Sequence, residues 1–115
     1  MEEVSVIELV QQGYTSFTEQ QKRFFDAIEI APQKWALSPW GDKDGGFWAI
    51  GIIGRTVLWY NHIERGFNIS AYREYNRIDE YWCSQSSLSE AVLSMKHAAD
   101  TGLAPVQAGP PISRR

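Results

Sequence analysis

The fold of this chain is decided by residues 46–60, which read GFWAIGIIGRTVLWY. Two runs rich in β-branched and aromatic residues, 46–53 and 56–60, lie on either side of the dipeptide Gly54-Arg55. A Gly-X dipeptide between two such runs is typical of a β-hairpin closed by a two-residue type II′ turn. The sequence therefore predicts an antiparallel hairpin at the centre of the chain.

A two-residue turn also fixes which residues of the hairpin face each other. Counting outward from the turn, the predicted pairs are Ile53 with Thr56, Ile52 with Val57, Ile50 with Trp59 and Trp48 with Asn61. Side chains alternate along a strand, so one face should carry Trp48, Ile50, Ile52, Val57 and Trp59. The other face should carry Phe47, Ala49, Gly51, Leu58 and Tyr60. This pattern predicts a hairpin covered on both sides, with Trp48 and Trp59 in the core.

Two helical patterns precede the hairpin. Residues 3–12 repeat apolar side chains near helical spacing and are followed by Gly13, which predicts a short first helix that stops there. A second helix is predicted to begin at a capping box and to stop at Pro32. The two candidate capping boxes are Thr18 with Gln21 and Ser16 with Glu19.

Further strands and a helix are predicted after the hairpin. Residues 61–66 resemble a loop, residues 67–72 alternate apolar and polar side chains as a half-buried third strand does, and residues 78–82 are a weaker candidate for a fourth strand. Ser87 with Glu90 forms another capping box, which predicts a last helix. The apolar face of that helix should carry Leu88, Val92, Met95 and Ala99.

These elements predict one α+β domain over residues 1–102. Its sheet is a three- to four-stranded antiparallel β-meander, flanked by two or three helices: an N-terminal helix or helix pair and a C-terminal helix. Residues 103–115 are rich in Pro and Gly and are predicted to form a flexible tail.

Composition and charge narrow the classes of function. The chain has 115 residues and a formal net charge of −3, which argues against binding to nucleic acid or to an anionic membrane surface. Cys83 is the only cysteine, so no internal disulfide is expected. The sequence contains no apolar run of the roughly 20 residues that span a bilayer and no signal-peptide pattern, so we expect a cytoplasmic location.

Two motifs suggest a metal site or a catalytic residue, but each lacks partners that such a site needs. The segment 42–46, Asp-Lys-Asp-Gly-Gly, resembles the opening of a calcium loop, but the later ligands of such a loop are missing at the required spacing. Cys83 could act as a nucleophile only beside a base, and the sequence gives no sign that His62 or His97 approaches it. We therefore predict no catalytic residue, no metal ligand and no cofactor.

Two segments mix large rings with polar and charged side chains, as recognition surfaces do. They span residues 59–67 and 72–82. The candidate binding residues within them are Asn61, His62, Glu64, Arg65, Tyr72, Tyr75, Arg77, Asp79 and Tyr81. The alternative interpretation is that the first segment consists of core rings and turn residues, and that the second is an exposed edge strand with mixed charge.

The central stretch also contains a series of short segments rich in Trp, Gly and Asn. They are Pro39-Trp40-Gly41, Gly46-Phe47-Trp48, Ile52-Ile53-Gly54, Trp59-Tyr60-Asn61, Ile63-Glu64, Gly66-Phe67-Asn68 and Tyr81-Trp82. With them, the stretch from roughly Trp35 to Gln85 resembles a family of short, uncharacterised bacterial proteins with the pattern GFW...IIG...WYN.IE.GFN. The resemblance transfers no catalytic residue and no substrate. It implies a bacterial, cytoplasmic, stand-alone domain.

Three hypotheses of function follow. The first is a non-enzymatic, immunity-like interaction protein whose partner is another protein, for example a toxin. The second is a small-molecule or carbohydrate-binding module, or a minor enzyme, that uses an aromatic cleft with Glu64 or Asp79. The third is a structural domain that forms a homodimer by pairing an uncovered sheet edge with its copy.

Overall fold

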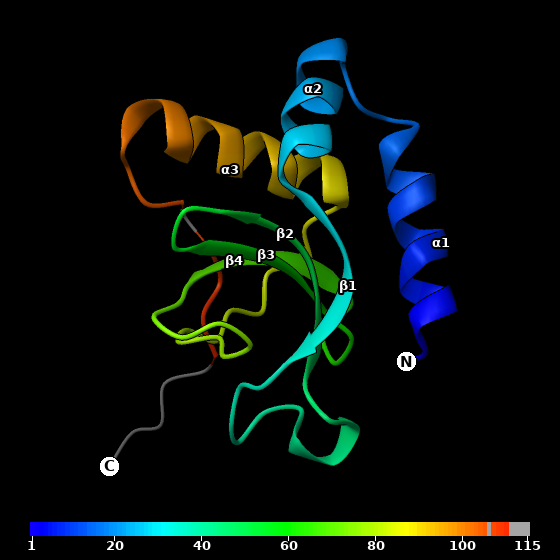
Figure 1. Ribbon diagram of the computed structural model, residues 1–115, viewed down its shortest axis with the longest axis vertical. Helices are drawn as coiled ribbons and strands as arrows, with labels where there is room; N and C mark the ends of the chain where they lie inside the picture. The colour runs from blue at the N-terminus through cyan, green and yellow to red at the C-terminus, as the bar shows by residue number, and fades with distance from the viewer. Residues whose placement is uncertain (106, 111–115) are drawn as a thin grey trace.

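A computed structural model of the protein describes residues 1–105 and 107–110, and it has three α-helices and a four-stranded sheet (Figure 1). In chain order the elements are α1 (Glu3–Tyr14), α2 (Glu19–Ile28), β1 (Glu29–Trp35), the 3-10 turn η1 (Asp42–Asp44), β2 (Phe47–Ile53), β3 (Thr56–Asn61), β4 (Gly66–Ala71) and α3 (Leu88–Thr101). The strands pair antiparallel in the order β1-β2-β3-β4. This architecture confirms the predicted α+β class and the antiparallel meander.

The sheet is covered differently on its two faces. The three helices pack on one face, and their core contains Val6, Val10, Phe25, Ile50, Leu58, Ile69, Leu88, Val92 and Met95, among others. The other face is covered mainly by irregular chain, and its core contains Trp35, Leu37, Phe47, Ala49, Val57, Trp59 and Ile78. We call the irregular segment 72–86 the cover segment; it joins β4 to α3 on the side of the sheet away from the helices (Figure 1).

The predicted register of the hairpin is right near its turn and wrong farther out. Ile53 pairs with Thr56 and Ile52 with Val57, as expected from the turn at Gly54-Arg55. The register then shifts, because Ile50 is an extra residue in β2 between Ala49 and Gly51. A bulge of this kind opposes two residues to one and moves the side chains beyond it to the other face. Gly51 still pairs with Leu58 on the turn side of the bulge, and the observed pairs beyond it are Ala49 with Trp59 and Trp48 with Tyr60.

The bulge also corrects the predicted core. Trp59 is fully buried, as expected, and it shares a face with Phe47 and Ala49. Trp48 lies on the opposite face and is only partly buried. Its indole Nε1 donates a hydrogen bond to the carbonyl oxygen of Met1 over 3.0 Å, and Lys34 Nζ lies 5.1 Å from the centre of the ring.

The fourth strand is at the beginning of the sheet and not at residues 78–82, where it was predicted. Residues 78–82 have no regular structure, whereas β1 follows α2 directly and includes Pro32. Proline lacks the N–H that a central strand needs, but an edge strand tolerates it. Pro32 therefore does not end α2, which ends four residues earlier at Ile28.

The helix starts are predicted correctly, whereas the ends of α1 and α2 are not. The capping box that begins α2 is Thr18 with Gln21, and the box that begins α3 is Ser87 with Glu90. Helix α1 continues through Gly13 to Tyr14. A Cβ atom at Gly13 would lie 2.7 Å from Leu88 Cβ, so this glycine permits α1 to pack closely against α3.

Candidate functional sites

The loop between β3 and β4 is organised by Asn61, which is fully buried. Its Oδ1 accepts hydrogen bonds from the backbone N–H groups of Ile63 and Glu64, over 3.0 and 3.1 Å. Its Nδ2 donates to the Tyr81 hydroxyl and to the Trp82 carbonyl oxygen, each over 3.0 Å. Asn61 therefore joins the loop between β3 and β4 to the cover segment. Both the oxygen and the nitrogen of its side-chain amide take part.

His62 also points inward, and its side chain is 12% exposed. Its Nε2 lies 2.7 Å from Asp44 Oδ2, and its ring centre lies 5.0 Å from that of Phe47. The hydrogen bond to His62 lowers the pKa of the Asp44 carboxyl group. Asp44, from the segment that resembles a calcium loop, is thus paired with His62. Among the described residues, no three His, Cys, Asp or Glu side chains are grouped closely enough to hold a metal ion.

The remaining charged residues of this loop do not form a reactive group. Arg65 is exposed and has φ 58°, a left-handed conformation that glycine adopts at less cost. Glu64 is partly buried, and together with burial its charge raises the pKa of the Cys83 thiol, burial being the larger cause. A raised pKa keeps the thiol protonated, the opposite of what a cysteine nucleophile needs.

Two of the predicted binding residues, Tyr72 and Tyr75, cover Trp35. Their ring centres lie 4.9 and 5.0 Å from that of Trp35, both in edge-to-face geometry. The Tyr72 hydroxyl donates to the Gly54 carbonyl oxygen over 2.8 Å, and the Tyr75 hydroxyl donates to Gln33 Oε1 over 2.6 Å. Tyr75 remains 55% exposed, so it both closes the core and contributes to the surface.

The other three predicted residues, Arg77, Asp79 and Tyr81, come together around a cleft of about 350 Å³. We call it the polar cleft; its lining is Leu37, Ser38, Trp40, Arg73, Glu74, Arg77, Ile78, Asp79 and Tyr81. The rings of Trp40 and Tyr81 are stacked, with centres 4.3 Å apart and planes 10° from parallel. Arg73 Nε lies 3.2 Å from Asp79 Oδ2.

Backbone hydrogen bonds hold the rim of the polar cleft in place. The N–H of Ala36 donates to the carbonyl oxygen of Asn76, and the N–H of Ile78 donates to the carbonyl oxygen of Ala36, each over 2.9 Å. A tight turn closes between Glu74 and Arg77, and the buried Ile78 side chain anchors it in the core. The charged side chains of the cleft therefore stand on a fixed backbone.

Sequence reasoning missed Trp40 and Arg73 as members of this cleft. Arg73 lies within the predicted segment 72–82, where its neighbours were singled out instead. Trp40 belongs to Pro39-Trp40-Gly41, far from Tyr81 along the chain, and only the three-dimensional fold stacks the two rings. The Pro-Trp-Gly tripeptide was the one available signal.

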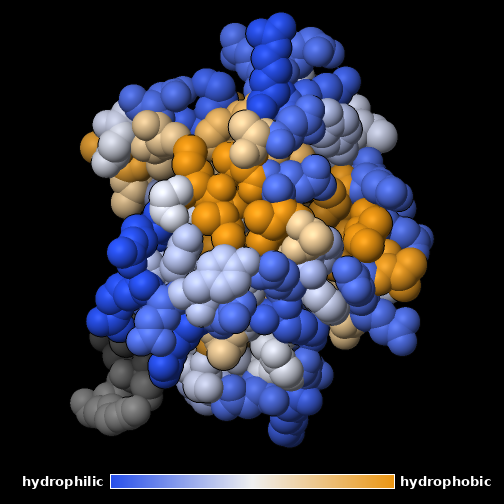
Figure 2. Space-filling model, viewed as in Figure 1, coloured by the Kyte–Doolittle hydropathy of each residue, from blue (hydrophilic) through white to orange (hydrophobic). Residues whose placement is uncertain are grey.

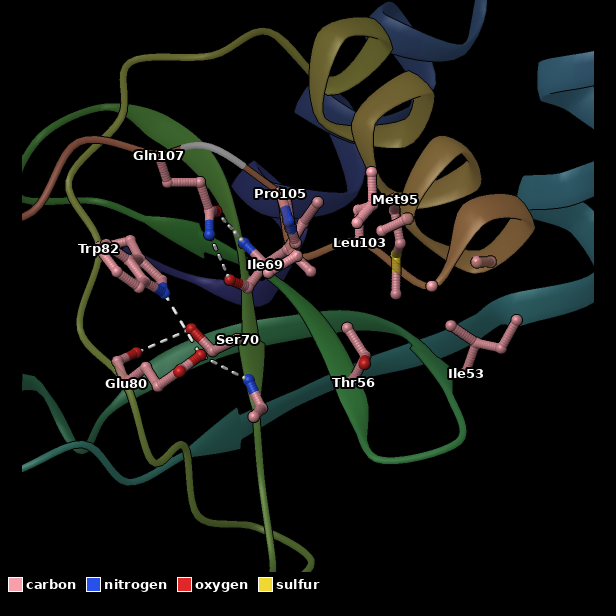
Figure 3. A pocket seen from close by; sticks show the side chains of 15 residues that line it. Ile53, Thr56, Ile69, Ser70, Glu80, Trp82, Met95, Leu103, Pro105 and Gln107 are labelled. Carbon is pink, nitrogen blue, oxygen red and sulfur yellow. Dashed lines mark hydrogen bonds between the residues drawn. The ribbon is translucent and has the colours of Figure 1, made fainter.

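A second and larger cleft, of about 530 Å³, lies where α3, β4 and the chain after α3 meet (Figure 3). We call it the apolar cleft, and nothing in the sequence analysis located it. Its lining comprises Ile53, Thr56, Ile69, Ser70, Ala71, Glu80, Trp82, Met95, Ala98, Ala99, Gly102, Leu103, Ala104, Pro105 and Gln107. Most of these side chains are aliphatic or small, which is the usual lining of a small-molecule site.

The chain after α3 forms one wall of this cleft because Gln107 pairs with β4. Its Oε1 accepts from the N–H of Ile69 over 2.6 Å, and its Nε2 donates to the carbonyl oxygen of Ile69 over 2.7 Å, as a neighbouring strand would (Figure 3). Within the predicted tail, Gln107 is thus in contact with the sheet, and Ala108 forms hydrogen bonds with Cys83 and Ser84 of the cover segment. Residues 106 and 111–115 of that predicted tail lie outside the described residues.

Comparisons with known protein families, with curated proteins and with solved structures find no match to this chain. The resemblance of residues 35–85 to short bacterial proteins stays a prediction. No helix in the described part of the chain has the length and apolar character needed to cross a membrane.

Proposed function

We propose that the protein is a non-enzymatic binding domain that recognises a protein partner through the polar cleft and its rim. The observation that carries this proposal is the stacked pair of Trp40 and Tyr81 beside Arg73 and Arg77. Trp, Tyr and Arg are the residue types that contribute most of the binding energy at protein interfaces.

The geometry of the rim supports recognition by contact. Trp40 is 36% exposed although it is stacked, so one face of its ring is held ready at the surface. Arg77 is exposed and forms no ion pair with another described residue, whereas Arg73 is paired with Asp79. The rim therefore offers an anchored ring and a guanidinium group to a carboxylate or a backbone carbonyl of the partner.

Other features of the surface favour a different protein as partner over a second copy joined at β4. The N–H groups of Phe67, Ile69 and Ala71 on the outer edge of β4 already donate to Ser86, Gln107 and Glu80. Figure 2 also shows an apolar patch across the strands between α3 and α1, of the kind that protein interfaces use. An immunity-like role, in which the partner is a toxin, is the specific form of this proposal.

The test is quantitative affinity capture from the source organism with three forms of the protein. They are the wild type, the Trp40→Ala, Arg77→Ala double variant, and a control with Arg23→Ala, an exposed position on α2. We expect a captured protein whose recovery falls with the double variant and is unchanged with the control. With the purified partner, the double variant should weaken binding by roughly 30-fold or more.

Two results would contradict the proposal. One is a partner that the wild type and the double variant bind with equal affinity, which would place the interface elsewhere. The other is repeated failure of the wild type to capture any protein under conditions in which it is folded, as shown by circular dichroism.

A further inference from the structure

The apolar cleft combines an apolar end with a polar end. Figure 3 shows Met95, Leu103, Thr56 and Ile53 at one end, and Glu80 with Trp82 at the other. Met95 is buried in the floor, whereas Ile53 and Leu103 are 37% and 65% exposed. Large apolar side chains left at the mouth of a cleft are typical of sites that bind an apolar group.

Glu80 is the one charged residue among the described residues that line this cleft. Its Oε1 accepts from the N–H of Ala71 over 2.9 Å and from the indole Nε1 of Trp82 over 3.4 Å. Within the described residues both donors reach the same oxygen, so Oε2 is the atom that a ligand can contact. Glu80 is an exposed residue, and the hydrogen bond from Ala71 orients its carboxylate beside the cleft.

Two other polar side chains of the cleft, Ser70 and Gln107, are already engaged. The Ser70 hydroxyl accepts from Trp59 Nε1 over 2.9 Å and donates to the Glu80 carbonyl oxygen over 2.7 Å. The Gln107 amide is used by both backbone groups of Ile69. Thus the one charged group that the described lining offers to a ligand is the Glu80 carboxylate, which favours a cation.

From this arrangement we infer that the apolar cleft binds an organic ammonium ion with an aliphatic or arylalkyl body. The ammonium group contacts Glu80 beside the Trp82 ring, and the body extends toward Met95, Leu103 and Ile53. The site is separate from the polar cleft, with which it shares no lining residue. It therefore stands whether or not the polar cleft binds a protein.

The experiment uses octylammonium, octanoate and octanol, which share a chain and differ in charge. Each is titrated at low salt, below the concentration at which it forms micelles, into the isotopically labelled protein. Binding is followed by NMR at the Ala71 amide and the Trp82 indole N–H, the two donors to Glu80. We expect saturable chemical-shift changes at both signals with octylammonium. The affinities for octanoate and octanol should be lower than that for octylammonium by roughly tenfold or more.

Three variants decide whether Glu80 selects the cation. Glu80→Gln keeps an oxygen acceptor for Ala71 and Trp82 and should weaken octylammonium binding by roughly tenfold. Glu74→Gln makes the same change of charge on the rim of the polar cleft and should leave the affinity unchanged. Leu103→Lys places a positive charge on an exposed wall residue and should weaken binding even if Glu80→Gln fails to fold.

Any of three outcomes would overturn the inference. The first is octanoate binding as tightly as octylammonium. The second is equal loss of affinity in Glu80→Gln and Glu74→Gln, which would mean that only the net charge matters. The third is the absence of saturable shifts at the Ala71 and Trp82 signals.

Discussion

The two faces of the sheet are covered by different means, and both clefts involve the irregularly covered face. The helical face is filled mainly by aliphatic and phenylalanine side chains, and its one buried polar side chain in the described residues is Gln21. The other face packs rings under the cover segment and buries three polar side chains, Asn61, Asn68 and Ser70, against it. Glu80 and Trp82 of the apolar cleft, and most of the polar cleft, belong to the cover segment.

This difference has a physical reason. A helix satisfies its own backbone groups and needs from the sheet only an apolar surface, whereas irregular chain must find hydrogen-bond partners elsewhere. Asn68 supplies such partners: its Nδ2 donates to the Ser84 carbonyl oxygen over 3.1 Å, and its Oδ1 accepts from the Ser84 N–H over 3.0 Å. Gly66 lets the chain approach at the same place, since a side chain there would collide with the Ser84 carbonyl oxygen. Side chains of β3 and β4 thus shape the segment that carries the clefts.

Adjacent residues of β3 provide the strongest test of this comparison, because Trp59 faces the cover segment and Leu58 faces the helices. Both side chains are fully buried. Trp59→Ala should cost about 3–5 kcal/mol and Leu58→Ala about 2–5 kcal/mol of unfolding free energy, measured by urea denaturation. Trp59 also donates a hydrogen bond to Ser70, so its loss should loosen the cover segment beyond the global effect.

Hydrogen exchange separates the two variants. Trp59→Ala should accelerate exchange of the Ile78, Asp79 and Ser84 amides more than its global loss of stability explains. In Leu58→Ala these amides should follow global unfolding. If the two variants gave the same exchange pattern at equal stability, the two coverings would not differ as described.

A smaller loss of stability is expected from substitutions of Asn61. They can separate the role of the amide oxygen from that of the amide nitrogen. Asn61→Ala removes partners from four groups and should cost about 2–3 kcal/mol. Asn61→Asp keeps the acceptor for the N–H groups of Ile63 and Glu64 but loses the donor to Tyr81 and Trp82. Urea denaturation measures the cost, and the chemical shifts of the Trp82 backbone and of the Ile63 amide report the two halves separately.

Asn61→Asp should therefore disturb the cover segment and leave the loop between β3 and β4 intact. If Asn61→Asp disturbed the loop between β3 and β4 as much as Asn61→Ala does, the two halves of the amide would not act separately. Gln85→Ala is a suitable control, because Gln85 is an exposed residue of the cover segment whose side chain makes no hydrogen bond with the described residues.

The sequence predicted those parts of the fold that depend on neighbouring residues and missed those that depend on distant ones. The turn at Gly54-Arg55, the capping box of α3 and one of the two candidate boxes for α2 depend on neighbouring residues, and the structure contains all three. Strand β1 was missed because Pro32 resembles a helix stop, and its identity as a strand comes from pairing with β2. The bulge at Ile50 was missed for a similar reason, since a count from the turn contains no information about the packing on either face.

The candidate sites were predicted only where their residues are close in the chain. Arg77, Asp79 and Tyr81 lie within one segment of mixed rings and charges, and they line the polar cleft together. Trp40 and the whole apolar cleft depend on contacts between distant segments, such as the pairing of Gln107 with Ile69. No local pattern reports contacts of this kind.

The smallest expected effect is on the pH dependence of stability. It arises on the ring-packed face, the face covered by irregular chain, from the pair of His62 and Asp44. The hydrogen bond from His62 lowers the pKa of Asp44 in the folded protein relative to the unfolded chain. A carboxyl group with a lowered folded pKa stabilises the fold above its unfolded pKa, near 3.9, and this contribution is lost as the pH falls through the lower, folded value. We expect acid to destabilise the wild type slightly more than Asp44→Asn, in urea denaturation at pH values between about 2 and 5.

The acid arm of this experiment has a built-in control, because Glu90 also has a lowered pKa, caused by its hydrogen bonds to Ser87 at the start of α3. Glu90→Gln should reduce the acid dependence through the helical face, while leaving the His62 ring signals unchanged. Asp44→Asn should reduce it through the ring-packed face and shift those ring signals, since the ring loses a charged partner 2.7 Å away. If Asp44→Asn left both the acid dependence and the His62 ring signals as in the wild type, the pair would not form in solution.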